Sequence, residues 1–128
     1  MLFRSPGAIE LLEYLRPKYK MFILSNGFTE LQSRKMSTAG IDSYFDGIIL
    51  SEEIGINKPK PELFEYALKK AGASLEESIM IGDMFDTDIV GAANIGMDQI
   101  FFNPKRLTGM HFAPTYEVGH LLEIKEIL

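Results

Sequence analysis

Short hydrophobic runs alternate with helix-like patterns along the whole chain. Continuous apolar runs predict buried strands at residues 21–24, 47–50, 78–82 and 100–102, with a brief edge strand at 116–118. Between them, apolar residues recur at helical spacing over residues 8–15, 28–40, 62–72, 87–94 and 121–128. Strands that alternate with helices are typical of βαβ units. We therefore predict a single domain over residues 1–128, an α/β fold with a doubly wound, Rossmann-like parallel sheet flanked by helices.

Proline and glycine mark several of the expected element ends. Pro61 lies at the first position of the third helix and Gly72 at its exit, positions that these residues favour. The pair Asn26-Gly27 allows a second interpretation, because Asn-Gly is a strong signal for a two-residue hairpin turn. The helical spacing of the residues that follow favours a strand followed by a helix instead.

Composition and charge narrow the classes of function. The 128 residues carry a net charge of -5, which does not favour nucleic acid or an anionic membrane as a partner. The chain has no cysteine and only two histidines, so disulfides, thiolate catalysis and zinc sites built on these residues are not expected. A hard cation held by carboxylates remains open. No apolar run approaches the length of a membrane span, and we expect a cytoplasmic protein.

Polar residues follow three of the predicted strands. In a parallel sheet the carboxyl ends of the strands share one edge, where ligands bind. A hydroxyl and backbone N–H groups can bind phosphate oxygens, a lysine can neutralise their charge, and two carboxylates can hold Mg²⁺. These candidates are Ser25, Asn26 and Gly27 after the first strand, Lys58 after the second, and Asp83 with Asp88 after the third.

Each of these residues also has a purely structural interpretation. Ser25 could cap the next helix, and a lone lysine is most often a solvated surface residue. Pro59 restricts the backbone at Lys58, however, and Asp86 or Thr87 is expected to cap the following helix, which leaves Asp83 and Asp88 without that role. Taken together, these residues indicate a phosphate and metal site more specifically than any one of them does alone.

Three ordered motifs carry a resemblance to a known family. Residues 23–27, 55–64 and 81–89 resemble the second, third and fourth motifs of the haloacid dehalogenase-like (HAD) superfamily of hydrolases. The match is to the phosphatase-like branch whose cap is inserted early in the chain, and it covers the C-terminal part of the core domain. The resemblance implies hydrolysis of a small phosphorylated metabolite, a phosphate monoester, through an aspartyl-phosphate with Mg²⁺ as cofactor.

The resemblance also implies roles for individual residues. Ser25, Asn26 and Gly27 would hold the phosphoryl group, Lys58 would be the catalytic lysine, and Asp83 and Asp88 would hold the metal. One departure is Lys60, which stands where relatives often have an acid before the helix; a lysine at this N-cap should cost the helix about 1 kcal/mol.

A larger departure concerns the family's first motif, an apolar strand ending in Asp-x-Asp that supplies the nucleophile. The only Asp-x-Asp string here is residues 86–88, which follows Gly82-Asp83 and belongs to the fourth motif. We expect this chain to lack the first strand and the cap, to be nearly inactive alone, and to bind Mg²⁺ weakly. In the family that first strand lies between the strands expected at 21–24 and 78–82. These two should therefore either pair directly or recruit a partner strand, through a dimer or strand exchange.

Two other classes of protein fit parts of the pattern. A catalytically inactive phosphate-binding or interaction module would use the same strand ends without chemistry. A receiver domain has a similar length, but it places its acidic pair early and its lysine late, whereas Lys58 precedes Asp83 in this chain.

Overall fold

The computed structural model describes residues 5–27, 34, 37 and 40–128. Its strands are β1 (Phe22–Ser25), β2 (Gly47–Leu50), β3 (Ile79–Gly82), β4 (Asp98–Phe102) and β5 (Tyr116–Val118). Its α-helices are α1 (Ala8–Leu15), α3 (Pro61–Ala71) and α4 (Val90–Asn94). Short 3₁₀ helices lie at η2 (Asp42–Tyr44), η3 (Ser51–Glu53), η4 (Leu75–Glu77) and η6 (Leu121–Glu126), with a π-helical turn at η5 (Phe85–Ile89). The helix predicted over 28–40 falls almost entirely outside the described residues.

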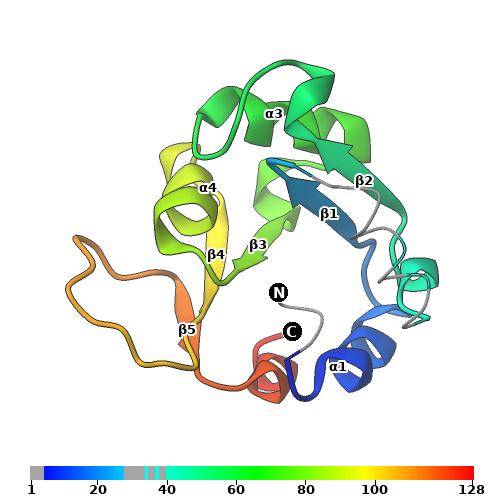
Figure 1. The fold of residues 1–128 in the computed structure, drawn as a ribbon, viewed down its shortest axis with the longest axis vertical. Coiled ribbons are helices and arrows are strands. Elements are labelled where there is room, and N and C mark those ends of the chain that lie inside the picture. Colours follow the sequence, from blue (N-terminus) through cyan, green and yellow to red (C-terminus); the bar gives the residue numbers. More distant parts are fainter. Residues whose placement is uncertain (1–4, 28–33, 35–36, 38–39) are drawn as a thin grey trace.

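The strands form two parallel sheets, one of β1 and β2 and the other of β3, β4 and β5 in that order (Figure 1). The α/β prediction is confirmed, because every strand pair is parallel and helices cover the strands. Of the two alternatives predicted for the first and third strands, direct pairing is wrong, since β1 and β3 belong to different sheets. Leu24 of β1 and Met80 of β3 instead pack on the same hydrophobic cluster around Phe64. Side-chain packing, and not a hydrogen-bonded ladder, joins these two strands.

Helices lie on two faces of these sheets. On one face α1 and η6 pack together over β4 and β5, and Ile79 and Ile81 of β3 contact the same cluster. On the other face α3 and α4 contribute Phe64 and Ala92, which meet Met80. Side chains of β3 thus alternate between the two helical layers, as a pleated strand requires. This is the doubly wound arrangement that the alternating pattern predicted.

Strands β1 and β3, each of which lacks a hydrogen-bonded neighbour on one side, are only partly covered. Of the four residues of β3, only Gly82 is buried, and in β1 only Ile23 is buried. In β4 every residue after Asp98 is buried. Strands of parallel sheets are ordinarily buried on both faces, so β1 and β3 have the exposure of edge strands. The residues described here place these two edges facing one another in the interior of the fold (Figure 1).

Apart from shifts of one residue at the ends of β1, β3 and α3, three elements differ from the predicted ones. Strand β4 begins two residues early, at Asp98, which pairs with Ile79 of β3. The polar Gln99 is buried in this strand, and its side-chain amide donates to the Met97 carbonyl. The helix predicted at 87–94 begins at Phe85 with the π-helical turn. The last helix is 3₁₀ over Leu121–Glu126. Among the described residues, no helix has the length and apolarity needed to cross a bilayer.

Candidate active site

The partly buried Lys58 and the buried Asp88 form an ion pair at the carboxyl edge of the strands. Lys58 Nζ lies 2.6 Å from Asp88 Oδ1, and the two side chains are only 13% and 7% exposed. The same ammonium donates a hydrogen bond of 3.1 Å to the carbonyl oxygen of Leu24, at the end of β1. The structure therefore brings together two predicted site residues that are 30 positions apart in the chain.

The side-chain amide of Asn26 hydrogen-bonds the backbone of Lys58 on both sides of its Cα atom. Its Oδ1 accepts a hydrogen bond from the Lys58 N–H at 2.6 Å, and its Nδ2 donates to the Lys58 carbonyl at 3.2 Å. The Ser51 hydroxyl in turn donates to the Asn26 carbonyl at 3.1 Å. The turn after β1 and the loop after β2 are thereby fastened together, with Lys58 between them and a cis peptide bond to Pro59.

Ser25 and Gly27 complete the turn after β1. The Ser25 hydroxyl oxygen accepts a hydrogen bond of 3.2 Å from the Gly27 N–H, and both Asn26 and Gly27 are exposed. Strand β1 pairs in parallel with β2, so the alternative of a two-residue hairpin at Asn26-Gly27 is excluded. The turn lies open at the carboxyl edge of the strands, where a ligand can reach it.

The loop that carries Lys58 is anchored at its start by Glu53. One carboxylate oxygen of Glu53 accepts hydrogen bonds from Lys70 Nζ and, at 2.8 Å, from Tyr66 Oη, and the other accepts the Leu50 N–H at 2.6 Å. These bonds, that with Lys70 foremost, lower the pKa of Glu53 from 4.5 to about 2. Glu53 thus ties the end of β2 to helix α3 while the loop passes between them.

Asp88 packs directly against the end of β3. A Cβ at Gly82 would overlap the Asp88 carboxylate, so only glycine permits this approach. Asp88 Oδ2 accepts the Met84 N–H at 3.2 Å. The prediction that Asp86 or Thr87 caps the next helix is wrong, because both lie inside the π-helical turn and its N-cap is Met84. The bond from Met84 fixes the carboxylate against β3 at the start of this turn.

Asp83 lies at the same edge but is exposed. Within the described part of the chain its carboxylate has no hydrogen bond or ion pair, and no cluster of three acidic or histidine side chains suited to a metal is present. Carboxylate oxygens suit Mg²⁺, which is often bound by one or two of them together with water and substrate phosphate. Asp83 and Asp88 therefore fit a partial Mg²⁺ site, although Asp88 is already engaged with Lys58 and Met84.

Three contributors to the site were not singled out from the sequence. Ser51, the Leu24 carbonyl and Gly82 position the predicted residues without standing out as candidates themselves. Gly82 carried a readable signal, because a glycine between an apolar strand and an acid often marks a close approach. The other two depend on contacts between separate loops.

Comparisons with known proteins show the family to which the chain belongs. The sequence model of the haloacid dehalogenase-like hydrolases matches residues 3–96. Pyrimidine 5'-nucleotidase YjjG of Escherichia coli is 37% identical over 125 residues, which are 96% of this chain and 56% of that protein. A glyceraldehyde 3-phosphate phosphatase of Methanothermobacter thermautotrophicus is 39% identical over 99 residues, or 77% and 44% of the two chains. The chain spans about half the length of these curated relatives.

Solved structures show the same similarity. The putative HAD-hydrolase YfnB of Bacillus subtilis, in a crystal structure bound to magnesium, superposes with a TM-score of 0.86 at 31% identity. A HAD phosphatase of Thermococcus onnurineus gives a TM-score of 0.85 at 32% identity. Each alignment covers 96% of this chain, and 54% and 57% of the respective neighbours.

Proposed function

Because the chain belongs to the haloacid dehalogenase-like hydrolases, we propose that it is the C-terminal part of a phosphatase core that binds the phosphoryl group of a phosphate monoester. The observation that carries this proposal is the partly buried ammonium of Lys58 at the carboxyl edge of the strands, between Asp88 and the Leu24 carbonyl. An ammonium has three donors, and these two contacts leave one for a phosphoryl oxygen.

The neighbouring groups support binding of the same anion. Asn26 and Gly27 form an exposed turn next to Lys58, in which the Gly27 N–H already donates to the Ser25 hydroxyl oxygen. The Ser25 hydroxyl can donate its proton to a phosphoryl oxygen while accepting the Gly27 N–H. Asn26 acts mainly on Lys58, because both polar atoms of its amide are bonded to the lysine backbone. Asn26 would therefore act as a positioning residue.

Asp83 is the residue best placed to hold Mg²⁺, with Asp88 beside it. When bound, the cation would neutralise charge on the phosphoryl group. Lys58 would share that task, and its pairing with Asp88 keeps the ammonium directed at the site. In this proposal the described residues bind and orient the phosphoryl group without supplying a nucleophile.

We further propose that the complete protein transfers the phosphoryl group to an aspartate, releasing the alcohol, and that water then cleaves the aspartyl-phosphate to give inorganic phosphate. None of the 128 residues matches that nucleophile by motif. The curated relatives act, by their names, on pyrimidine nucleotides or on glyceraldehyde 3-phosphate, so the proposed substrate class is a small phosphorylated metabolite.

The test combines a binding and an activity measurement on the chain of residues 1–128. Calorimetry with inorganic phosphate, with and without Mg²⁺, should detect binding that Lys58→Met abolishes. Lys60→Met is the matched control, because Lys60 is an exposed neighbouring cation outside the ion pair.

Hydrolysis of 4-nitrophenyl phosphate by the chain of residues 1–128 should stay near the uncatalysed rate. Absence of phosphate binding, or equal loss in both variants, would refute the site. Turnover at a rate typical of enzymes would refute the proposal that the nucleophile lies outside these 128 residues.

A second candidate is a binding or interaction module with no chemistry in any assembly. The ion pair favours it in one respect, since Lys58 and Asp88 satisfy each other without a substrate. The same activity assay on a longer protein that carries an Asp-x-Asp motif upstream distinguishes the two: turnover lost in Lys58→Met supports the enzyme, and phosphate binding without turnover supports the module.

A further inference from the structure

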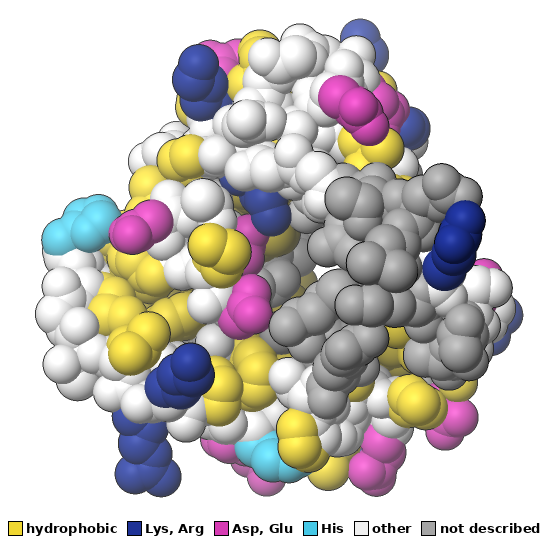
Figure 2. Space-filling model, viewed as in Figure 1, with side chains coloured by type: hydrophobic (Ala, Val, Ile, Leu, Met, Phe, Trp, Pro, Cys, Tyr) yellow, Lys and Arg dark blue, Asp and Glu magenta, His cyan; other side chains and the backbone are white. Residues whose placement is uncertain are grey.

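A pocket opens beside the proposed phosphoryl site and shares Asp83 with it. Its volume is about 420 Å³, which is within the usual range for sites that bind small organic molecules. It lies between the end of β3 and the loop that joins β4 to β5. Its apolar and aromatic lining comes from Met84, Phe85, Phe101, Leu107, Met110 and His111. Figure 2 shows hydrophobic side chains gathered on this part of the face, next to acidic ones.

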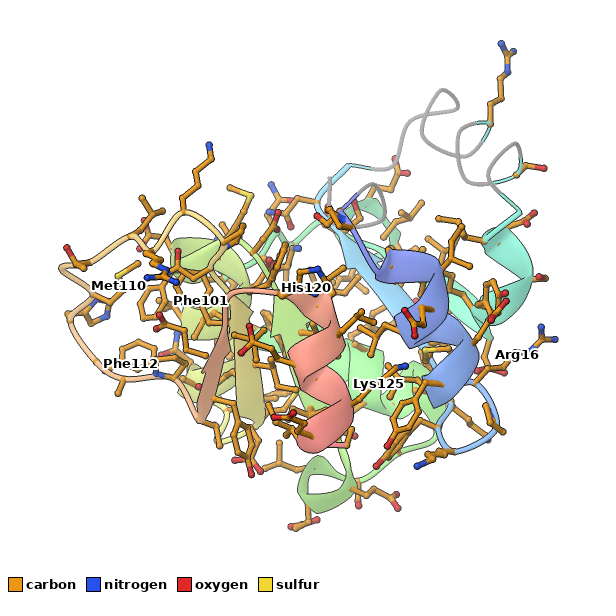
Figure 3. The ribbon with its side chains drawn as sticks, turned by 90° about the horizontal axis from the view of Figure 1, so that it is seen from below. Arg16, Phe101, Met110, Phe112, His120 and Lys125 are labelled. Carbon is orange, nitrogen blue, oxygen red and sulfur yellow. The ribbon has the colours of Figure 1, made fainter. Side chains whose placement is uncertain are left out.

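Aromatic rings form a rigid wall of this pocket. The ring of Phe85 meets Phe101 edge to face at 5.3 Å between centroids and His111 at 5.8 Å. Phe112 packs behind them, 4.8 Å from Phe85. Figure 3 shows Phe101, Met110 and Phe112 on the same side of the molecule, around the β4–β5 loop. Because Phe85 and Phe101 are buried, their rings are fixed before any ligand arrives.

The rim carries two apolar side chains that are unusually exposed. Met84 is 61% exposed and Leu107 is 57% exposed, the two highest values among the large hydrophobic residues described. Methionine side chains adapt to flat or irregular ligands and make favourable contacts with aromatic rings. Met84 and Met110 together line the pocket with Leu107. The rim is therefore suited to cover a planar apolar group that rests on the aromatic wall.

The charged residues of the pocket lining restrict which chemical group can bind there. Asp83 and Asp86 both line the pocket, so an anionic group there would meet two carboxylates. Asp83 is also the residue proposed to hold the cation at the phosphoryl site, so the pocket and that site share a wall. A ligand that spans them would place its anionic end at Lys58 and its uncharged end among the rings.

We propose that this pocket binds an uncharged aromatic ring, as the organic part of a phosphate monoester whose phosphoryl group lies at Lys58. This inference rests on the proposed function for the position of the phosphoryl group, but the ring site itself is defined by the pocket. It names aryl or heteroaryl phosphates, in preference to small aliphatic ones, as the substrate class.

Methyl-labelled methionine offers a direct test, because two of the seven methionines line the pocket. NMR titration of the chain with indole, a neutral ring, should shift the methyl signals of Met84 and Met110 and leave that of Met21, which packs near α1, unchanged. Phenyl phosphate should bind about tenfold more tightly than methyl phosphate, because only the former buries a ring.

Leu107→Asp places a charge on the rim at an exposed position, so the fold should tolerate it. It should weaken indole binding by about tenfold or more and remove the advantage of phenyl phosphate. Ile9→Asp is the matched control, since Ile9 is 48% exposed on α1, away from the pocket. Equal affinities for the two esters, indole shifts outside the pocket, or equal effects of both variants would overturn the proposal. Loss of inorganic phosphate binding with indole binding intact would instead refute the phosphoryl site.

Discussion

Lys58 and Asp88 show how one ion pair can organise a site. The ammonium is held by a carboxylate from the end of β3 and a carbonyl from the end of β1, and its backbone is clamped by Asn26. Because the pair is nearly excluded from water, each charge depends on the other. Its contribution to stability and its contribution to phosphate binding can therefore be separated by substitution.

Replacing Asp88 by asparagine should destabilise the fold by about 3 kcal/mol, because the Lys58 ammonium is left buried without a counter-charge. Urea denaturation followed by circular dichroism measures this change. Glu10→Gln is the control: Glu10 pairs with Lys125 at 3.1 Å on the surface, where its side chain is 60% exposed, and its loss should cost less than about 1 kcal/mol. The double variant Lys58→Met, Asp88→Asn should recover part of the lost stability. Equal costs for Asp88→Asn and Glu10→Gln would contradict the burial of the pair.

Glu53 gives the fold a defined dependence on acid. Its pKa is lowered in the folded state to about 2, chiefly by the hydrogen bond from Lys70, followed by those from the Leu50 N–H and Tyr66. A lowered pKa means that the folded state favours the carboxylate, so the stabilisation is present above about pH 4.5 and is lost as the pH falls toward 2. The midpoint of thermal unfolding of the native chain should therefore fall as the pH is lowered from about 4.5 to about 2.

Glu53→Gln should flatten this pH dependence while lowering the midpoint at neutral pH. Glu52→Gln serves as the control, because Glu52 is the exposed neighbour and makes none of these bonds. If both variants retain the native slope, the acid sensitivity must arise elsewhere in the chain.

At the scale of elements, most of the sequence-based prediction was confirmed where local signals agreed. Helix α3 begins at Pro61 and ends at Ala71, followed by Gly72 as its C-cap in the left-handed conformation at φ 66°. Strands β2 and β5 have the predicted bounds. The π-helical turn was not predicted; within it, Asp88 packs on Gly82, a contact between separate elements that the local sequence pattern does not show.

The N-cap of α3 lies near the proposed phosphoryl site and tests whether the helix-capping rules hold there. Lys60 occupies this position and its side chain makes no capping hydrogen bond, as the sequence led us to expect. Lys60→Asp should therefore stabilise the chain by about 1 kcal/mol, through an accepted N–H and a favourable charge at the helix start. The urea midpoint measures the gain.

Lys69→Asp makes the same change of charge in the last turn of α3 and should destabilise it, because the C-terminal end of the helix dipole is negative. A gain from both variants would point to overall charge and not to capping.

At the scale of the molecule, the sequence predicted the composition of the site but not its contacts. The strand ends bring Ser25, Lys58 and Asp83 to one edge, as parallel strands require. That Asp88 would pair with Lys58, and that Asn26 would bind the Lys58 backbone, depends on the relative placement of separate loops. The roles of these residues in binding phosphate or metal remain predictions.

The prediction that the chain associates with a partner strand rests on the edges of β1 and β3 that face one another. Because both strands have half-buried apolar residues and an unpaired edge in the described structure, we propose that a strand from a second copy or another chain occupies the space between them. Multi-angle light scattering at micromolar concentrations should detect dimers or larger species. A compact monomer over the whole concentration range would rule out this recruitment.

The division into two sheets also has a consequence for how the chain opens. In the described residues, ladder hydrogen bonds connect β1 only to β2, and β3 only to β4, so the two halves are joined by side chains and loops. Segments joined in this way can exchange their amide hydrogens as separate units. We expect the amides of β1 and β2 to exchange with solvent sooner than those of β4, which lies between two strands. A strand that entered between β1 and β3 would slow that exchange in both halves at once and merge them into one cooperative unit.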